Sequence, residues 1–138
     1  RIGIWGWSNG GSMTLYALTH SQIFKAGVAV APVTDARNYD ATYMERYLGV
    51  PEDNPKGYNQ TALSRLAENL GGALLLVHGT SDDNVHFQNS VQFISALIKA
   101  GKQFDFMLYP NKTHGIAGAA AQGHLFHMMQ DHFERELK

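Results

Sequence analysis

The stretch Ile2-Gly3-Ile4-Trp5-Gly6-Trp7-Ser8-Asn9-Gly10-Gly11, with the helix-like segment from Ser12 to Leu18 behind it, decides the fold of this chain. Its first residues form a short apolar run that favours a β-strand. Residues 6–10 then fit the pattern Gly-x-Ser-x-Gly, in which a serine occupies a sharp strand-to-helix turn. Glycine allows such a turn where a Cβ would clash, so the pattern predicts that Ser8 is exposed at a sheet edge. The pentapeptide alone also fits an ordinary strand–helix turn.

Composition limits the classes of protein to which the chain can belong. With 138 residues, 44% of them hydrophobic and 17% charged, residues 1–138 are expected to form one globular domain. A net charge of −1 provides no electrostatic field for nucleic acid, so no nucleic-acid partner is expected. No apolar run is long enough to span a bilayer, and no membrane contact is evident. The absence of cysteine excludes disulfides and thiolate metal sites and leaves the compartment open.

Apolar runs alternate with helical patterns along the chain. Four strands are predicted, at 2–5, 26–31, 73–78 and 104–109. The middle two are almost continuously apolar, which is typical of strands buried on both faces of a parallel sheet. This alternation predicts an α/β doubly wound sheet of about four parallel strands with flanking helices.

Two helices follow from apolar spacing. The first is predicted from Phe87, Val91, Ile94 and Ile98, and the second from Leu125, Met129, His132, Phe133 and Leu137. Gly101 is expected to end the first helix in a left-handed conformation. The turn-forming residues 51–57 predict a polar loop.

Ser8, Asp82 and His114 occur in the order typical of α/β-hydrolases. A serine hydroxyl becomes a good nucleophile when a histidine accepts its proton and a carboxylate holds that histidine. Asp82 and Asp83 follow the third predicted strand and His114 follows the fourth, so all should reach the same sheet edge as Ser8. The residues themselves do not distinguish Asp82 from Asp83 as the acid, and either aspartate would also serve as a helix cap.

Five longer segments of the sequence match a known family more specifically than the pentapeptide does. They are Gly6–Gly11, Ala31–Val33, Tyr39–Gly49, His78–Gln88 and Thr113–Ile116. Together they resemble the dipeptidyl-peptidase IV branch of the prolyl oligopeptidase family, over essentially the whole chain. The resemblance implies that residues 1–138 are the C-terminal portion of an α/β-hydrolase catalytic domain, which begins just before the nucleophile strand. The first strands of that domain and a β-propeller are then expected to lie upstream of this segment.

The resemblance also implies roles for individual residues. Ser8 matches the nucleophile, Asp82 the acid and His114 the base, and the backbone N–H of Asn9 matches one oxyanion donor. The family's second donor is a tyrosine hydroxyl that lies upstream of Arg1, as do the glutamates that hold the substrate's amino terminus. The substrate pocket is matched by the aromatic walls Tyr39 and Tyr43, the apolar lining Val33 and Val85, and the carbonyl-binding side chain of Asn84.

Two residues depart from the family pattern, and one pair has another explanation. Asn9 and Ala36 stand where the family commonly has larger aromatic residues, which should leave the proline pocket roomier. This puts a strict preference for proline in doubt. Tyr39 and Tyr43 are four residues apart, so without the resemblance they would be interpreted as ordinary packing on one helix face.

The expected function is therefore that of a serine exopeptidase acting on peptides. It would release amino-terminal dipeptides through an acyl-enzyme, prefer proline or alanine before the cleaved bond, and need no cofactor. The alternatives are an acylaminoacyl-peptidase or esterase of the same fold, or a non-catalytic fragment that acts as an interaction module. His124, His127 and His132 also allow a metal interpretation, but no recognisable ligand set completes it.

Two further expectations concern assembly and location. The strand before Ser8 should present an open, apolar edge in this segment, which predicts a homodimer or other self-association. The resemblance is compatible with a periplasmic, secreted or membrane-anchored parent, and the residues leave the localisation unknown.

Overall fold

The computed structural model covers Arg1–Lys138 and contains one parallel four-stranded sheet. The strands are β1 (Ile2–Trp7), β2 (Phe24–Val30), β3 (Ala73–Gly79) and β4 (Asp105–Tyr109). Their order in the sheet is β1-β2-β3-β4, and every neighbouring pair is parallel. The predicted α/β architecture is therefore confirmed, and each expected strand is present to within two residues at either end.

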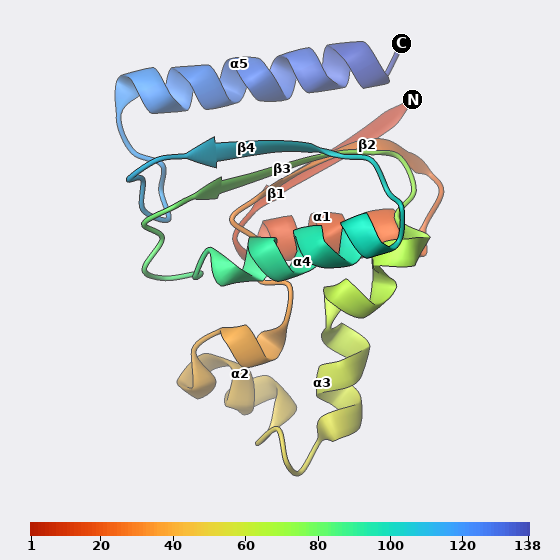
Figure 1. Cartoon of the computed structure of the whole chain (residues 1–138), viewed down its shortest axis with the longest axis vertical. Helices are drawn as coiled ribbons and strands as arrows, with labels where there is room; N and C mark the ends of the chain where they lie inside the picture. The colour runs from red at the N-terminus through yellow and green to blue at the C-terminus, as the bar shows by residue number, and fades with distance from the viewer.

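Helices cover both faces of this sheet. Figure 1 shows α1 (Asn9–His20) and α4 (Gln88–Lys99) on one face and α5 (Ala119–Glu136) on the other. The remaining helical segments form an extension below α1 and α4; they are the 3₁₀ turns η1 (Ala36–Asn38) and η2 (Leu63–Asn69) and the helices α2 (Ala41–Leu48) and α3 (Pro55–Thr61). The carboxyl ends of all four strands lead to loops at one edge, away from the chain termini.

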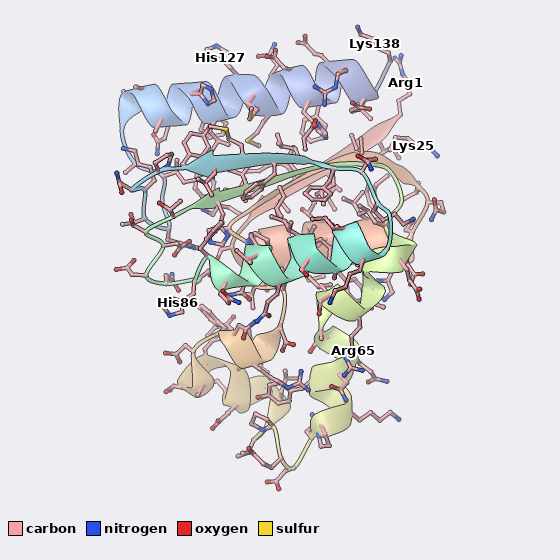
Figure 2. The ribbon with its side chains drawn as sticks, viewed as in Figure 1. Arg1, Lys25, Arg65, His86, His127 and Lys138 are labelled. Carbon is pink, nitrogen blue, oxygen red and sulfur yellow. The ribbon has the colours of Figure 1, made fainter.

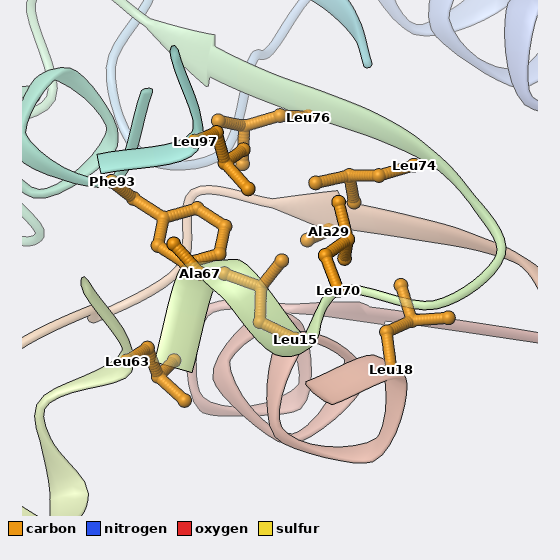
Figure 3. Packing of buried hydrophobic residues seen from close by; sticks show 10 residues of the cluster. All are labelled: Leu15, Leu18, Ala29, Leu63, Ala67, Leu70, Leu74, Leu76, Phe93 and Leu97. Carbon is orange, nitrogen blue, oxygen red and sulfur yellow. The ribbon is translucent and has the colours of Figure 1, made fainter. Parts of the chain in front are cut away.

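Alternate side chains of β3 belong to two separate hydrophobic clusters, one on each face of the sheet. Leu74 and Leu76 pack against residues of α1, η2 and α4, and Phe93 of α4 is fully buried among them (Figure 3). Leu75 and Val77 point to the opposite face, beneath α5. A strand that is buried on both faces needs apolar residues at every position, which explains its unbroken apolar sequence.

The expected stripe on α4 is wrong by one residue. Ile98, which the spacing assigned to the core, is 65% exposed, whereas Leu97 is fully buried. The buried face of α4 consists of Asn89, Ser90, Phe93 and Leu97. Two of these residues are polar, so a search for apolar spacing selected the neighbouring, partly exposed face instead.

The predicted polar loop at 51–57 is also partly wrong, because α3 begins inside it at Pro55. Asn54 caps this helix: its Oδ1 accepts a hydrogen bond from the Gly57 N–H at 3.0 Å. Proline is favoured at the first helical position, where it has no N–H to leave unpaired. A turn-forming composition therefore concealed a helix start.

The remaining helix predictions hold. Leu125, Met129 and His132 are the buried residues of α5, and Gly101 follows α4 with a φ of 68°. Figure 2 shows Arg1 and Lys138 at the same end of the molecule, with His86 and His127 at its surface. None of the helices combines the length and apolar character that crossing a bilayer requires.

Candidate active site

Ser8 is the single residue between β1 and α1, and its backbone is strained. Its φ of 60° and ψ of −122° lie in a region that non-glycine residues rarely adopt, at a cost of about 1–3 kcal/mol. Two hydrogen bonds hold the turn: the Ser8 N–H donates to the Val30 carbonyl at 2.8 Å, and the Ser8 carbonyl accepts from the Ser12 N–H at 3.0 Å. Asn9 occupies the first position of α1, where a backbone N–H has no partner within the helix.

Two glycines near Ser8, Gly6 and Gly11, are required by close packing, whereas a Cβ on Gly10 would meet no atom within 4 Å. A Cβ on Gly6 would lie 2.2 Å from the carbonyl carbon of Gly10, and a Cβ on Gly11 would lie 2.8 Å from the Val30 carbonyl oxygen. Only a residue without a side chain lets β1, α1 and β2 approach this closely. The sharp turn predicted around Ser8 is therefore present.

Asp82 lies in the loop that follows β3, and its carboxylate is completely enclosed. Oδ1 accepts backbone N–H groups from Asn84 at 3.0 Å and Val85 at 2.9 Å. Oδ2 lies 2.8 Å from Nδ1 of His114. Asp83 is exposed and its side chain makes no hydrogen bond. The structure thus separates two aspartates that the residue pattern left equivalent.

His114 lies in the loop between β4 and α5, with 22% of its side chain exposed. Because a carboxylate only accepts hydrogen bonds, Nδ1 carries the proton in this contact and Nε2 keeps a free lone pair. The indole N–H of Trp7 donates to the His114 carbonyl at 2.8 Å. The residue before Ser8 therefore holds the histidine loop at the same sheet edge.

An apolar hollow adjoins the start of α1. Its volume is about 270 Å³, and the expected pocket residues Asn9, Val33 and Ala36 all line it. The other lining residues, mostly apolar, are Ser12, Met13, Tyr16, Met44, Leu48, Thr61 and Leu63. The small side chains at positions 9 and 36 leave this space open, so it can accept an apolar group.

Tyr39, Tyr43 and Asn84 line a second, more polar hollow of about 680 Å³. Tyr39 precedes α2, so the expectation that both tyrosines share one helix face is wrong. Their rings nevertheless meet edge to face, with centroids 5.6 Å apart, and the Tyr39 hydroxyl donates to Asn84 Oδ1 at 2.9 Å. Val85 lines neither hollow and is fully buried, so its contact with a substrate remains a prediction.

Two buried polar residues near this edge were missed. His78, the next-to-last residue of β3, is fully enclosed and lies 3.2 Å from Asp82 Oδ2 through its Nε2. Burial lowers the pKa of His78 below its usual value, so its ring is neutral at neutral pH. Asn89 accepts the Thr34 N–H at 3.0 Å and thereby joins α4 to the loop after β2. The sequence signal for His78 was a polar residue directly after the apolar run of β3. The signal for Asn89 was a polar residue on the same helix face as Phe93 and Leu97.

Two of the three histidines considered as metal ligands have hydrogen-bond partners in the protein. The Tyr109 hydroxyl and His124 Nδ1 lie 2.7 Å apart, and His132 Nε2 lies 3.3 Å from the Ala73 carbonyl. His127 is exposed on α5 (Figure 2).

Comparison with known proteins relates the whole chain to one family. The sequence profile of the prolyl oligopeptidase family matches residues 1–138. Dipeptidyl peptidase 4 from Bos taurus is 49% identical over 141 residues, a match that covers 99% of this chain and 18% of the bovine protein. Prolyl endopeptidase FAP from Mus musculus is 44% identical and covers the same shares of the two chains.

Solved structures agree with this relationship. The crystal structure of Porphyromonas gingivalis dipeptidyl peptidase 4 superposes with a TM-score of 0.96 at 44% identity, covering 99% of this chain and 20% of that one. A putative dipeptidyl aminopeptidase IV from Bacteroides ovatus gives a TM-score of 0.94 at 40% identity, covering 99% and 19%. The chain therefore spans about a fifth of the length of the relatives it matches.

Proposed function

The chain belongs to the prolyl oligopeptidase family, and on that premise we propose that the protein is a serine peptidase that releases dipeptides from the amino termini of peptides. The observation that carries the proposal is the 2.8 Å contact between His114 Nδ1 and the buried Asp82 carboxylate, in a loop tied to the residue before Ser8. A strained serine turn next to such a pair is the arrangement that nucleophilic acyl transfer needs.

The proposed reaction proceeds in two halves. His114 Nε2 accepts the hydroxyl proton as Ser8 Oγ attacks the carbonyl carbon of the second residue, and Asp82 stabilises the imidazolium that forms. The N–H of Asn9 donates to the oxyanion. The C–N bond breaks as His114 returns the proton to the leaving amine. Water then attacks the ester on Ser8 with His114 again as base, which frees the dipeptide and restores the serine.

The two hollows suggest how the substrate is held. The tyrosine-lined hollow carries Asn84, whose amide is suited to bind a peptide carbonyl, and Tyr39 and Tyr43 offer flat faces to a proline ring. The apolar hollow beside Asn9 and Ala36 offers additional room. We therefore propose that proline and alanine are accepted before the cleaved bond and that larger apolar residues are tolerated there as well.

The test uses the full-length protein and a fluorophosphonate probe. The proposal expects the probe to label Ser8, labelling to disappear in Ser8→Ala, and Gly-Pro-p-nitroanilide to be cleaved. An N-acetylated aminoacyl p-nitroanilide is assayed beside it, and cleavage of that substrate alone would favour the acylaminoacyl-peptidase alternative. Cleavage of simple esters alone would favour an esterase, and no labelling of the folded protein would favour an inert interaction module.

A further inference from the structure

His78 is an unusual side chain for its place in the fold. It lies at the end of β3, directly after an unbroken run of buried leucine and valine, and is itself fully buried. Each ring nitrogen nevertheless has a partner. Nδ1 lies 2.7 Å from the Ser90 hydroxyl, and Nε2 lies 2.8 Å from the Val85 carbonyl and 3.2 Å from Asp82 Oδ2.

These partners fix the position of the His78 proton. The Val85 carbonyl and the Asp82 carboxylate only accept hydrogen bonds, so Nε2 must carry the proton that they share. Nδ1 of the neutral ring then has a lone pair, which accepts the hydroxyl proton of Ser90. Burial keeps the ring neutral because it disfavours the charged form. The Val85 carbonyl and the Asp82 carboxylate thus select the tautomer, and the Ser90 hydroxyl adapts to it by donating to Nδ1.

Asp82 consequently receives donors at both of its oxygens. Oδ1 accepts the N–H groups of Asn84 and Val85, Oδ2 accepts the ring N–H of His114, and Nε2 of His78 lies 3.2 Å from Oδ2. An ionised carboxylate has about four acceptor sites, so three hydrogen bonds and the close contact with His78 leave it little freedom. Rotation of the carboxylate would break several bonds at once, and Oδ2 therefore stays directed at His114.

We propose that His78 and Ser90 are positioning residues for the reaction: the Ser90 hydroxyl holds the His78 ring through Nδ1, and the Nε2 side of that ring lies against Asp82 and keeps it in the orientation that supports His114. This inference rests on the proposed function of Ser8, Asp82 and His114. The simpler interpretation is a core histidine whose only task is to satisfy the Val85 carbonyl. The two interpretations differ in what they expect of catalysis in a protein that still folds.

The first test replaces His78 in the full-length protein. His78→Leu fills similar space without a donor, whereas His78→Gln places an amide N–H near the position of ring Nε2. In metal sites, loss of the hydrogen-bond partner behind a ligand typically costs about 10–100-fold in activity, and a comparable loss is expected for the partner behind Asp82. We expect His78→Leu to lower kcat by about that factor with little change in KM, and His78→Gln to recover most of the loss.

The second test addresses Ser90. Ser90→Ala leaves the Nδ1 lone pair of the buried ring without a donor, so the ring is held at one nitrogen only and can turn away from Asp82. We expect kcat to fall while KM stays nearly constant. Thr19→Val is the matched control, because it removes another buried hydroxyl, one that bonds to the Leu15 carbonyl at 3.0 Å near the far end of α1. This control should lower the unfolding midpoint and leave kcat unchanged.

Two readouts accompany these assays: the unfolding midpoint, and the rate of fluorophosphonate labelling per folded molecule. If the folded His78→Leu and Ser90→Ala proteins lose stability but label and turn over like wild type, the proposal is overturned. If His78→Leu does not fold, Ser90→Ala and His78→Gln decide the question by the same criteria. A wild-type protein that labels at Ser8 but releases no dipeptide would contradict the proposed substrate alone, because the labelling rates still test His78.

Discussion

At the scale of single residues, the two neighbouring aspartates after β3 have opposite environments. Asp82 is enclosed and bound to His114, whereas Asp83 faces solvent. We expect Asp82→Asn to lower kcat of the full-length protein by on the order of 10⁴, because an amide would hold the wrong tautomer of His114. Asp83→Asn is the matched control and should change kcat little. Steady-state kinetics on a chromogenic dipeptide substrate would measure both, and a larger loss in Asp83→Asn would show that the acid has been misassigned.

The apolar hollow gives a prediction about specificity. Ala36→Trp should fill the space beside Asn9 and Val33 and exclude large side chains before the cleaved bond. We expect kcat/KM for leucine, methionine or phenylalanine at that position to fall by about 10-fold or more relative to alanine, since pocket fit discriminates by such factors. Ala100→Trp, at the exposed residue directly after α4, is the control. Equal losses for all substrates would indicate that the hollow does not receive this side chain.

The buried imidazole gives a prediction about pH. Because burial lowers the pKa of His78 in the folded protein, the unfolded chain takes up this proton first as pH falls. Neutral His78 therefore makes its full contribution to stability above about pH 6.5, the usual pKa of histidine. This contribution declines as the pH falls through the lowered pKa of His78 in the folded protein. Thermal unfolding between pH 5 and 8 should show a shallower acid-side decline in His78→Gln than in wild type. Parallel curves for the two proteins would mean that His78 does not contribute to the slope.

At the scale of elements, α4 offers a test of its buried face. Leu97 is fully buried in the cluster beneath α1 and α4, while its neighbour Ile98 is 65% exposed. We expect Leu97→Ala to lower the free energy of unfolding by about 2–5 kcal/mol and Ile98→Ala to change it by about 0.5 kcal/mol or less. Chemical denaturation would compare them, and a reversed order would show that the helix is rotated from the position described.

The same helix shows what a sequence can and cannot reveal about elements. The four strands and α5 could be predicted because continuous or regularly spaced apolar residues mark buried surfaces. The face of α4 could not, because Asn89 and Ser90 are polar residues that are buried through specific partners in distant segments. The start of α3 was hidden by turn-forming residues that act as a cap.

The candidate site also contains residues that the sequence predicts and residues that it does not. Ser8 and His114 follow from local motifs and from their positions after strands, while the choice between Asp82 and Asp83 depended on family resemblance. The pairing of His78 with Asp82 depends on the path of the loop after β3, which no periodicity in the sequence encodes.

At the scale of the whole molecule, β1 is an edge strand that pairs only with β2. Ile2 and Trp5 on this strand are 47% and 52% exposed. An open apolar edge recruits other strands, so we expect the 138-residue chain to self-associate through or near β1. Size-exclusion chromatography with light scattering would measure this. Trp5→Lys should shift the chain toward monomer, and a monodisperse wild-type monomer at tens of micromolar would contradict the prediction.

The indole of Trp7 bonds to the carbonyl of His114 across 107 positions of sequence, and this separation affects when the site can form during synthesis. Ribosomes add about 5–20 residues per second, so Ser8 is made about 5–20 s before His114 exists. The sheet can grow strand by strand in that interval, because its spatial order follows the order of translation. Ser8, the proposed nucleophile, therefore stays without its proposed base until β4 and the loop behind it have emerged. On the proposed function, this order of synthesis keeps the nascent chain from attacking neighbouring chains before it is complete.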